Sequence, residues 1–334
     1  MRHLEFYIRA AYSFVVFASI CTAFLIVLLL QSKNHIFEYA SEQASVERHE
    51  PFPISVDPES KTIEENPLVK NYFSEHLAHN QNSKQNWWNQ IAAIFAPKDW
   101  YQNLASPVSR IIVIWPGERK EEAAKNISDI LGWNNTEKTE FKSLVDTEFP
   151  IMPDGKYFPS QYIIHKYATP SEVAELVNSK FNDEVLSRYP PELDEIIPLE
   201  DTLTIASLLE REASDFDNMR EISGVIWNRL FIDMPLQLDA SLQYVKGSNA
   251  YEPAWWPKIY PRDKFIKSPF NTYQNEGLPP APIANPSVEA IVAALNPVVT
   301  DCLFYFHTNN GEYHCSTNYK EHVSKLRSIY GRGS

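Results

Sequence analysis

The chain has 334 residues, 44% of them hydrophobic, which is enough apolar material for one domain of ordinary size or two small ones. Its formal net charge of −13 leaves no basic surface of the kind that phosphate neutralisation requires, so nucleic acid is not an expected partner. The three cysteines, Cys21, Cys302 and Cys315, lack metal-ligand spacing, and we expect neither a metal site nor a cofactor.

The N-terminal region contains an uncharged apolar run from residue 11 to residue 30, long enough to span a bilayer as a helix. Arg2 and Arg9 precede the run, whereas only Lys33 follows it before the acidic residues begin. This asymmetry predicts a cytoplasmic segment at 1–10, a single transmembrane helix at 11–31 and an extracytoplasmic remainder. A cleaved signal peptide is the alternative, but the run is longer than a usual signal core and no small-residue cleavage pattern follows it.

Residues 32–108 form a juxtamembrane region whose fold the sequence does not indicate. Within it, Trp87, Ile91 and Phe95 recur at helical spacing and predict a short amphipathic helix that packs on the following domain. A membrane-surface role is the less favoured alternative, because the helix lacks the basic polar face that such helices usually carry.

From Arg110 the pattern changes to a β-branched run, a Pro-Gly turn and a helical segment, which predicts strand, turn and helix. We place the start of the main domain here, at 109–334, and expect an α+β fold of mixed helices and strands. Thr169 and Glu172 form a capping box with Pro170 at the first helical position, and this helix is expected to run to about Leu186.

The stretch 203–214 reads LTIASLLEREAS and predicts a helix that carries two carboxylates in an apolar run. At about 100° per residue, Glu212 falls within the apolar sector and Glu210 on its flank, while Arg211 points to the solvent side. A carboxyl in apolar surroundings resists ionisation, so Glu212 is a candidate general acid. The structural alternative is a buried glutamate satisfied by an arginine or by backbone amides. A second helix is expected to begin with an Asn218–Glu221 capping box and to form a tight αα-hairpin with the first.

Three loop-like stretches follow, at 234–244, 268–273 and 277–286, and their prolines suggest stiff loops that could hold amides and aromatic rings around a sugar. Each alone is equally consistent with an ordinary structural loop. Farther on, residues 303–306 and 313–316 predict two strands joined at Asn310-Gly311. With those two as the turn residues, Cys315 faces Phe306, and a Cys302–Cys315 disulfide would need a different register.

The order of these motifs resembles the catalytic domain of the YceG/MltG-like family, the membrane-anchored endolytic murein transglycosylases. The resemblance covers roughly residues 110–326. Many relatives carry a LysM-like module before this domain, and residues 32–108 show no such module. The strand, turn and helix beginning at Arg110 could be its counterpart. It rests on the following stretches in this order: PDGKYFPSQY, LTIASLLEREA, VIWNRL, PLQLDASLQY, SPFNTYQNEGLPPAPIANP and LFYFHTNNGEYHCSTNYKEH.

The resemblance implies that Glu212 is the catalytic residue, the same glutamate that the helix geometry selects. It also implies that Gln237, Asp239, Asn271 and Tyr273 bind the substrate. Asn228 could bind the substrate as well, or could equally be a helix-end residue bonded to backbone. The implied reaction cleaves the β-1,4 bond between N-acetylmuramic acid and N-acetylglucosamine within peptidoglycan strands and leaves 1,6-anhydro ends. A hydrolase would ordinarily need a second carboxylate, for which Asp239 is the candidate.

The expected location is the cell membrane, and cell-wall synthases are partners that such an anchored enzyme could meet. The alternative from another class is a catalytically silent, membrane-anchored protein that binds glycan or recruits synthases. Glu212 argues against it, because a binding cleft gains little from burying an ionisable group.

Overall fold

The computed structural model describes residues 16, 17, 19, 50–72, 108–148, 154–247 and 254–331. They divide into two compact units, which are described separately. The described part of the first comprises residues 16, 17, 19, 108–112 and 161–166, and the second contains the rest. No helix among the described residues is long and apolar enough to cross a membrane. Apart from residues 16, 17 and 19, the anchor predicted at 11–31 lies outside them, as does the helix predicted at 87–95.

The described segment 50–72 belongs to the core of the second unit. It contains strands β1 (Val56–Asp57) and β2 (Thr62–Ile63), which pair antiparallel, and helix α2 (Leu68–Tyr72). The amide of Ser55 donates to the carbonyl of Leu295, and Phe52 and Val69 are buried in the main hydrophobic cluster. Part of the region for which the sequence indicated no fold therefore completes the core.

The strand, turn and helix predicted from Arg110 are confirmed, and the turn contains Gly117 at φ 78°, a left-handed conformation that glycine adopts at little cost. Strand β3 pairs with β4 in a two-stranded sheet, and the capping box of Thr169 and Glu172 is present. The elements of this stretch are β3 (Ser109–Ile114), α5 (Lys120–Leu131), α6 (Asn135–Glu148), β4 (Ser160–His165), α7 (Pro170–Glu184), the 3₁₀ helix η3 (Leu186–Arg188) and α8 (Pro191–Ile196).

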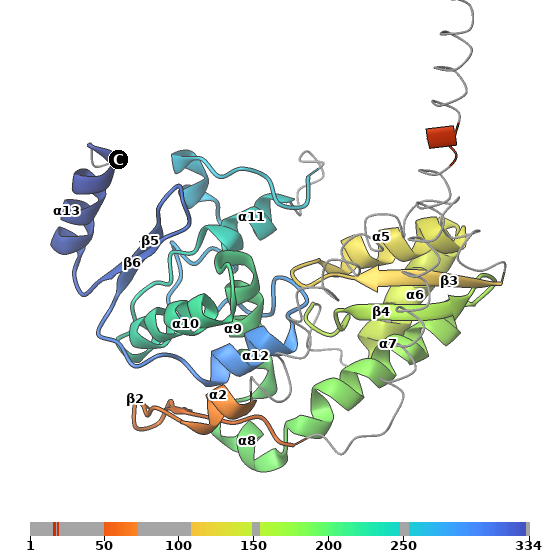
Figure 1. The fold of residues 1–334 in the computed structure, drawn as a ribbon, viewed down its shortest axis with the longest axis horizontal. Helices are drawn as coiled ribbons and strands as arrows, with labels where there is room; N and C mark the ends of the chain where they lie inside the picture. Colours follow the sequence, from red (N-terminus) through yellow and green to blue (C-terminus); the bar gives the residue numbers. More distant parts are fainter. Residues whose placement is uncertain are drawn as a thin grey trace, which may run out of the picture. The chain divides into compact units, whose positions relative to one another are not determined.

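Helices α9 (Leu199–Glu212), α10 (Phe216–Phe231) and α12 (Val288–Leu295) pack on one another and form the centre of the second unit (Figure 1). Every residue of α9 from 202 to 209 is buried, because neighbouring elements cover it on all sides. The predicted αα-hairpin of α9 and α10 is confirmed, but its cap is not at Asn218. Asp215 is the N-cap of α10 and accepts from the amide of Asn218, so the helix begins earlier than expected.

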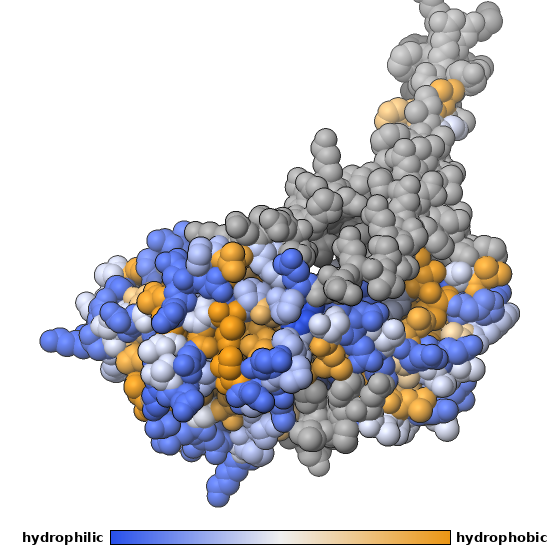
Figure 2. Space-filling view, turned by 90° about the horizontal axis from the view of Figure 1, so that it is seen from below, coloured by the Kyte–Doolittle hydropathy of each residue, from blue (hydrophilic) through white to orange (hydrophobic). Residues whose placement is uncertain are grey.

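The C-terminal part contains α11 (Asp239–Gly247), the 3₁₀ helix η4 (Pro261–Phe265), β5 (Phe304–His307), β6 (Tyr313–Ser316) and α13 (Tyr319–Tyr330). The first predicted loop is thus helical from Asp239 onward, whereas the stretches at 268–273 and 277–286 are irregular as predicted. In Figure 1, α13 lies beside the hairpin of β5 and β6. The face seen from below in Figure 2 intersperses hydrophilic and hydrophobic residues. Mixed helices and strands confirm the α+β class.

Candidate active site

Glu212 is the last residue of α9, and its carboxyl group contacts two segments distant in sequence. Its Oε1 accepts a hydrogen bond of 3.2 Å from the amide of Ala240, in the first turn of α11. Its Oε2 accepts one of 3.1 Å from the hydroxyl of Tyr305, on β5. These two donors fix the orientation of the carboxyl group and leave it facing a cavity.

The pKa of Glu212 is raised, and desolvation by burial is the main cause. The negative charge of Asp239 raises it further, whereas the bonds from Ala240 and Tyr305 and the charge of Arg211 act in the opposite direction. The C-terminal position on α9 adds to the effect, because the negative end of a helix disfavours a carboxylate. The result is a carboxyl group that holds its proton to a higher pH than an ordinary glutamate.

Glu210 performs a different task. Its Oε2 accepts from both the amide (2.9 Å) and the hydroxyl (2.6 Å) of Ser287, and Ser287 is the N-cap of α12. Burial raises the pKa of Glu210, and the bonds from Ser287 oppose that rise. Glu210 therefore holds the start of a core helix, consistent with its predicted place on the flank of the apolar face.

Arg211 differs from the prediction that it points to solvent. Its guanidinium lies 4.0 Å from the ring centroid of Trp256, and the side chain is half-buried. A Cβ added at Gly117 would lie 3.1 to 3.2 Å from the Arg211 side chain. The helix face was assigned from α9 alone, whereas two distant segments, around Gly117 and Trp256, cover its outer side.

The cavity at Glu212 has a volume of about 570 Å³. Three of the predicted substrate-binding residues, Gln237, Asp239 and Tyr273, line it. The Tyr273 hydroxyl donates to Asp239 Oδ1 over 2.7 Å. The full lining consists of Glu212, Arg229, Met234, Leu236, Gln237, Leu238, Asp239, Lys264, Tyr273, Phe304, Tyr305, Phe306, His307, Tyr319 and His322.

Two loops converge on the cavity because they are tied together by hydrogen bonds. The Gln237 amide donates to the Thr272 carbonyl, and the Leu238 amide donates to the Thr272 hydroxyl. Gln237 has φ 51°, which is uncommon for a residue other than glycine and costs backbone energy. Buried Leu236 and Leu238 flank it, so their burial directs the Gln237 side chain outward.

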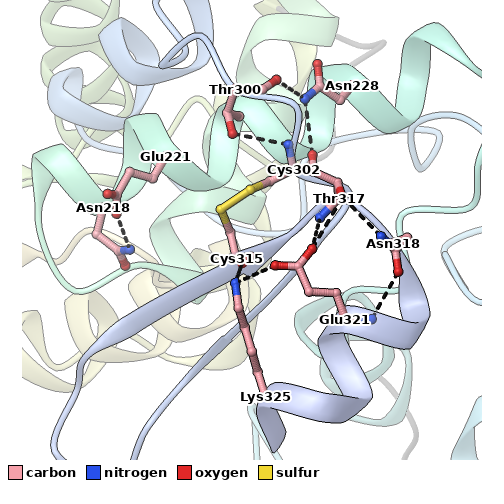
Figure 3. Close-up of a disulfide and its surroundings, with 10 residues drawn as sticks. All are labelled: Asn218, Glu221, Asn228, Thr300, Cys302, Cys315, Thr317, Asn318, Glu321 and Lys325. Atoms are coloured by element: carbon pink, nitrogen blue, oxygen red, sulfur yellow. Dashed lines mark hydrogen bonds and ion pairs between the residues drawn. A yellow bond between two sulfur atoms is a disulfide. The ribbon is translucent and has the colours of Figure 1, made fainter.

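The other two predicted residues do not line the cavity. Asn271 is buried, and its amide nitrogen donates to the carbonyls of Lys264 and Ile266. Asn228 donates from α10 to the carbonyls of Thr300 and Cys302 (Figure 3). Both amides satisfy backbone carbonyls. Asn271 therefore departs from the expectation that it faces the substrate, whereas Asn228 has the backbone-bonding role that was its stated alternative.

The hairpin that carries Tyr305 has a different register from the predicted one. Cys315 is opposite Tyr305 rather than Phe306, because the Thr308 amide bonds the Glu312 carbonyl and closes a three-residue loop. Gly311 takes the left-handed position of that loop, at φ 85°. In this register Cys302 and Cys315 form a disulfide with a Cα–Cα distance of 5.8 Å (Figure 3).

Sequence reasoning did not single out Tyr305, Arg229 or the aromatic residues of β5 and α13. Arg229 is buried and donates to the carbonyls of Leu303, Pro235 and Leu236, which joins the end of α10 to both walls of the cavity. The available signal was a cation in the last turn of α10, next to apolar residues. Within the described residues, no group of His, Cys, Asp and Glu is arranged to hold a metal ion.

The site thus combines an α+β fold, a half-buried carboxyl group at the end of a core helix, and a cavity of polar and aromatic side chains. Residues 59–328 match the sequence profile of the YceG-like family, and the chain belongs to this family.

Two relatives are each named an endolytic murein transglycosylase. The protein of Bacillus subtilis (strain 168) is 34% identical over 178 residues, which is 53% of this chain and 48% of that protein. The protein of Streptococcus pneumoniae serotype 2 is 31% identical over 183 residues, 52% of this chain and 33% of that one. The matched part is thus about half of the first relative and a third of the second.

A crystal structure of a yceG-like protein from Listeria monocytogenes has a similar fold. It superposes with a TM-score of 0.55 at 26% sequence identity, covering 65% of this chain and 75% of that one. The fold over that share of the chain is therefore similar to that of a yceG-like protein.

Proposed function

We propose that the protein is an endolytic lytic transglycosylase. It cleaves the β-1,4 bond between N-acetylmuramic acid and N-acetylglucosamine within peptidoglycan strands and leaves 1,6-anhydro-N-acetylmuramic ends. The observation that carries the proposal is the half-buried Glu212 side chain, whose carboxyl is held by Tyr305 and Ala240 at a cavity and whose pKa is raised by desolvation. The family and the names of the matching relatives support the same reaction.

Glu212 supplies both proton transfers. The protonated carboxyl gives its proton to the glycosidic oxygen as the bond from that oxygen to C1 of the muramic residue breaks. The carboxylate then takes the proton of the C6 hydroxyl, whose oxygen forms the new bond to C1. Atoms balance without water, and the carboxyl is regenerated in its protonated form. The Tyr305 hydroxyl and the Ala240 amide stabilise the carboxylate between the two transfers.

The remaining predicted residues of the cavity bind the glycan. Gln237 offers an amide for sugar hydroxyl and acetamido groups, and Tyr273 presents a ring while its hydroxyl holds Asp239. Asp239 serves as a binding group and keeps the pKa of Glu212 raised through its charge. A transglycosylase requires no second carboxylate as base or nucleophile, in contrast to a hydrolase.

The location follows the sequence: residues 1–10 are cytoplasmic, residues 11–31 are the anchor and the catalytic domain at 109–334 is extracytoplasmic, near the cell-wall synthases. Protease added to intact spheroplasts is expected to digest the C-terminal domain. Survival of that domain until lysis would show the opposite orientation.

The product of the reaction tests the proposal. Purified peptidoglycan strands are incubated with the full chain, and mass spectrometry identifies the new ends. We expect cleavage within the strands, which leaves new anhydro ends. Reducing ends would identify a hydrolase with Asp239 as its second carboxylate. An absence of cleavage while strands still bind would identify the silent glycan-binding protein.

A further inference from the structure

One wall of the Glu212 cavity takes no part in the proposed reaction. It consists of Phe304 and Phe306 from β5 together with Tyr319 and His322 from α13. Because side chains alternate along a strand, β5 presents different residues to its two sides. Tyr305 and His307 hydrogen-bond to Glu212 and Asn218, whereas the two phenylalanines contact α13. The strand therefore has a polar side at the reaction centre and an aromatic side at α13.

The aromatic side forms a compact cluster. The ring of Phe304 lies 5.8 Å from that of Tyr319 and 5.6 Å from that of His322, measured between centroids. His322 also lies 5.6 Å from Phe306. Arg229 sits 5.2 Å from the Phe304 ring, so the cluster continues into the floor of the cavity.

Tyr319 is 66% exposed although it belongs to this cluster. It is the first residue of α13, and the helix start is already secured by Asn318, whose side chain accepts from the amide of Glu321. No residue of α13 is buried. The ring is therefore mostly open to solvent, while Phe304 and His322 hold it at the edge of the cavity.

His322 adds an unsatisfied polar group to the same wall. Its Nδ1 is buried without a hydrogen-bond partner, and no described residue bonds its other ring nitrogen. A polar atom of this kind that borders a cavity can be satisfied by a ligand or by water. Burial lowers the pKa of His322, so the neutral ring can donate from one nitrogen and accept at the other.

We propose that Tyr319, His322 and Phe304 form a sugar-binding subsite for a residue of the glycan strand that is not cleaved. A pyranose has an apolar face of C–H groups and a rim of hydroxyl and acetamido groups. The Tyr319 ring takes the apolar face, and His322 hydrogen-bonds the rim. The inference rests on the proposed function. It adds the path of the bound glycan strand, which extends from Glu212 toward α13.

Binding to the full chain tests the subsite, with Glu212→Gln in every variant to prevent turnover. The probe is a peptide-free, uncross-linked peptidoglycan strand, and calorimetry gives Kd. Tyr319→Ala is expected to raise Kd about five- to tenfold, because one aromatic contact is lost. Tyr319→Phe keeps the ring and is expected to bind like the parent. Ile329→Ala, at an exposed apolar residue on the same helix outside the cavity lining, is the matched control.

Two results would overturn the subsite. One is unchanged Kd for Tyr319→Ala. The other is equal weakening by Tyr319→Ala and Ile329→Ala, which would show a general role of α13 in packing. Thermal unfolding of each variant checks that the helix is intact. Product analysis of the protein with Glu212 present is run in parallel. If it gives anhydro ends while Tyr319→Ala binds normally, only the subsite fails, whereas absence of those ends contradicts the proposed function itself.

Discussion

Two cavities in the second unit are each lined by more than one acidic residue, and they differ in what surrounds these residues. The larger, about 880 Å³, lies at β1, β2 and α8 and is lined by six acidic residues, all exposed: Asp57, Glu59, Glu64, Glu65, Glu192 and Glu195. The pKa of Asp57 is lowered, chiefly by its bond from the Ser60 hydroxyl. In the smaller cavity, burial raises the pKa of Glu212. Desolvation of one carboxyl, rather than cavity volume or the number of acids, distinguishes the smaller of these two cavities from the larger.

The largest expected effect is that of Glu212→Gln, which keeps the side-chain volume and removes the transferable proton. Turnover of peptidoglycan strands is expected to fall by about 10²- to 10⁴-fold, because general acid-base catalysis contributes that much. Release of anhydro-muramic products measures turnover, and circular dichroism checks the fold. Glu210→Gln is the matched control and is expected to be much milder. Activity of Glu212→Gln together with loss in Glu210→Gln would reverse the assignment of the two glutamates.

Glu210→Ala is expected to act on stability. The variant leaves the amide and hydroxyl of Ser287 without their acceptor at the start of α12, which costs about 1–3 kcal/mol of unfolding free energy. Urea denaturation followed by circular dichroism measures the loss. Turnover per folded molecule is expected to stay near that of the parent. A variant as stable as the parent would show that the bonds to Ser287 contribute little.

Tyr305→Phe tests the environment of Glu212 through the pH dependence of turnover. The variant removes a donor to the Glu212 carboxylate, which disfavours the charged form and raises the pKa further. The acid form then persists to higher pH, so the decline of activity on the alkaline side is expected to move up by about one pH unit. The pH dependence of turnover measures this shift. Tyr313→Phe, outside the cavity lining, is the control, and a shift to lower pH would contradict the assigned hydrogen bond.

The smallest effect is expected in the acidic cavity. Neutralising two of its exposed carboxylates with Glu192→Gln and Glu195→Gln is expected to change turnover by less than about twofold, because exposed substitutions away from a site change free energies little. The assay is the one used for Glu212→Gln. A loss approaching that of Glu212→Gln would show that the larger cavity takes part in catalysis.

Local patterns predicted the elements whose structure depends on near neighbours. The period of α9 placed Glu212 on the apolar side, and the Thr169 capping box marked the start of α7. The contact between Glu212 and Tyr305 joins residues 93 apart in sequence, so no local pattern could reveal it. Proline-stiffened loops did bring Gln237, Asp239 and Tyr273 to one cavity.

Two of the differences between prediction and structure concern side-chain amides that bond distant backbone. Asn271 and Asn228 donate to backbone carbonyls of other segments. These carbonyls lie near the amides only when the chain is folded, so the sequence does not show which amides they bond. The hairpin register depended on whether Gly311 belongs to a two-residue or a three-residue loop, and the same letters permit both. A register shift of one residue places Cys315 opposite Tyr305 instead of Phe306, and the disulfide is present in this register.

The central claim is that Glu212 holds its proton at a pH where an ordinary glutamate has lost it. Infrared difference spectroscopy between the parent and Glu212→Gln, followed across a pH titration of the full chain, measures that carboxyl directly. We expect it to titrate above the ordinary glutamate value of about 4.3, and turnover to decline as pH rises through the same range, because the acid form is the proton donor. Titration at or below the ordinary value, with turnover unchanged across it, would contradict the assignment of Glu212 as general acid.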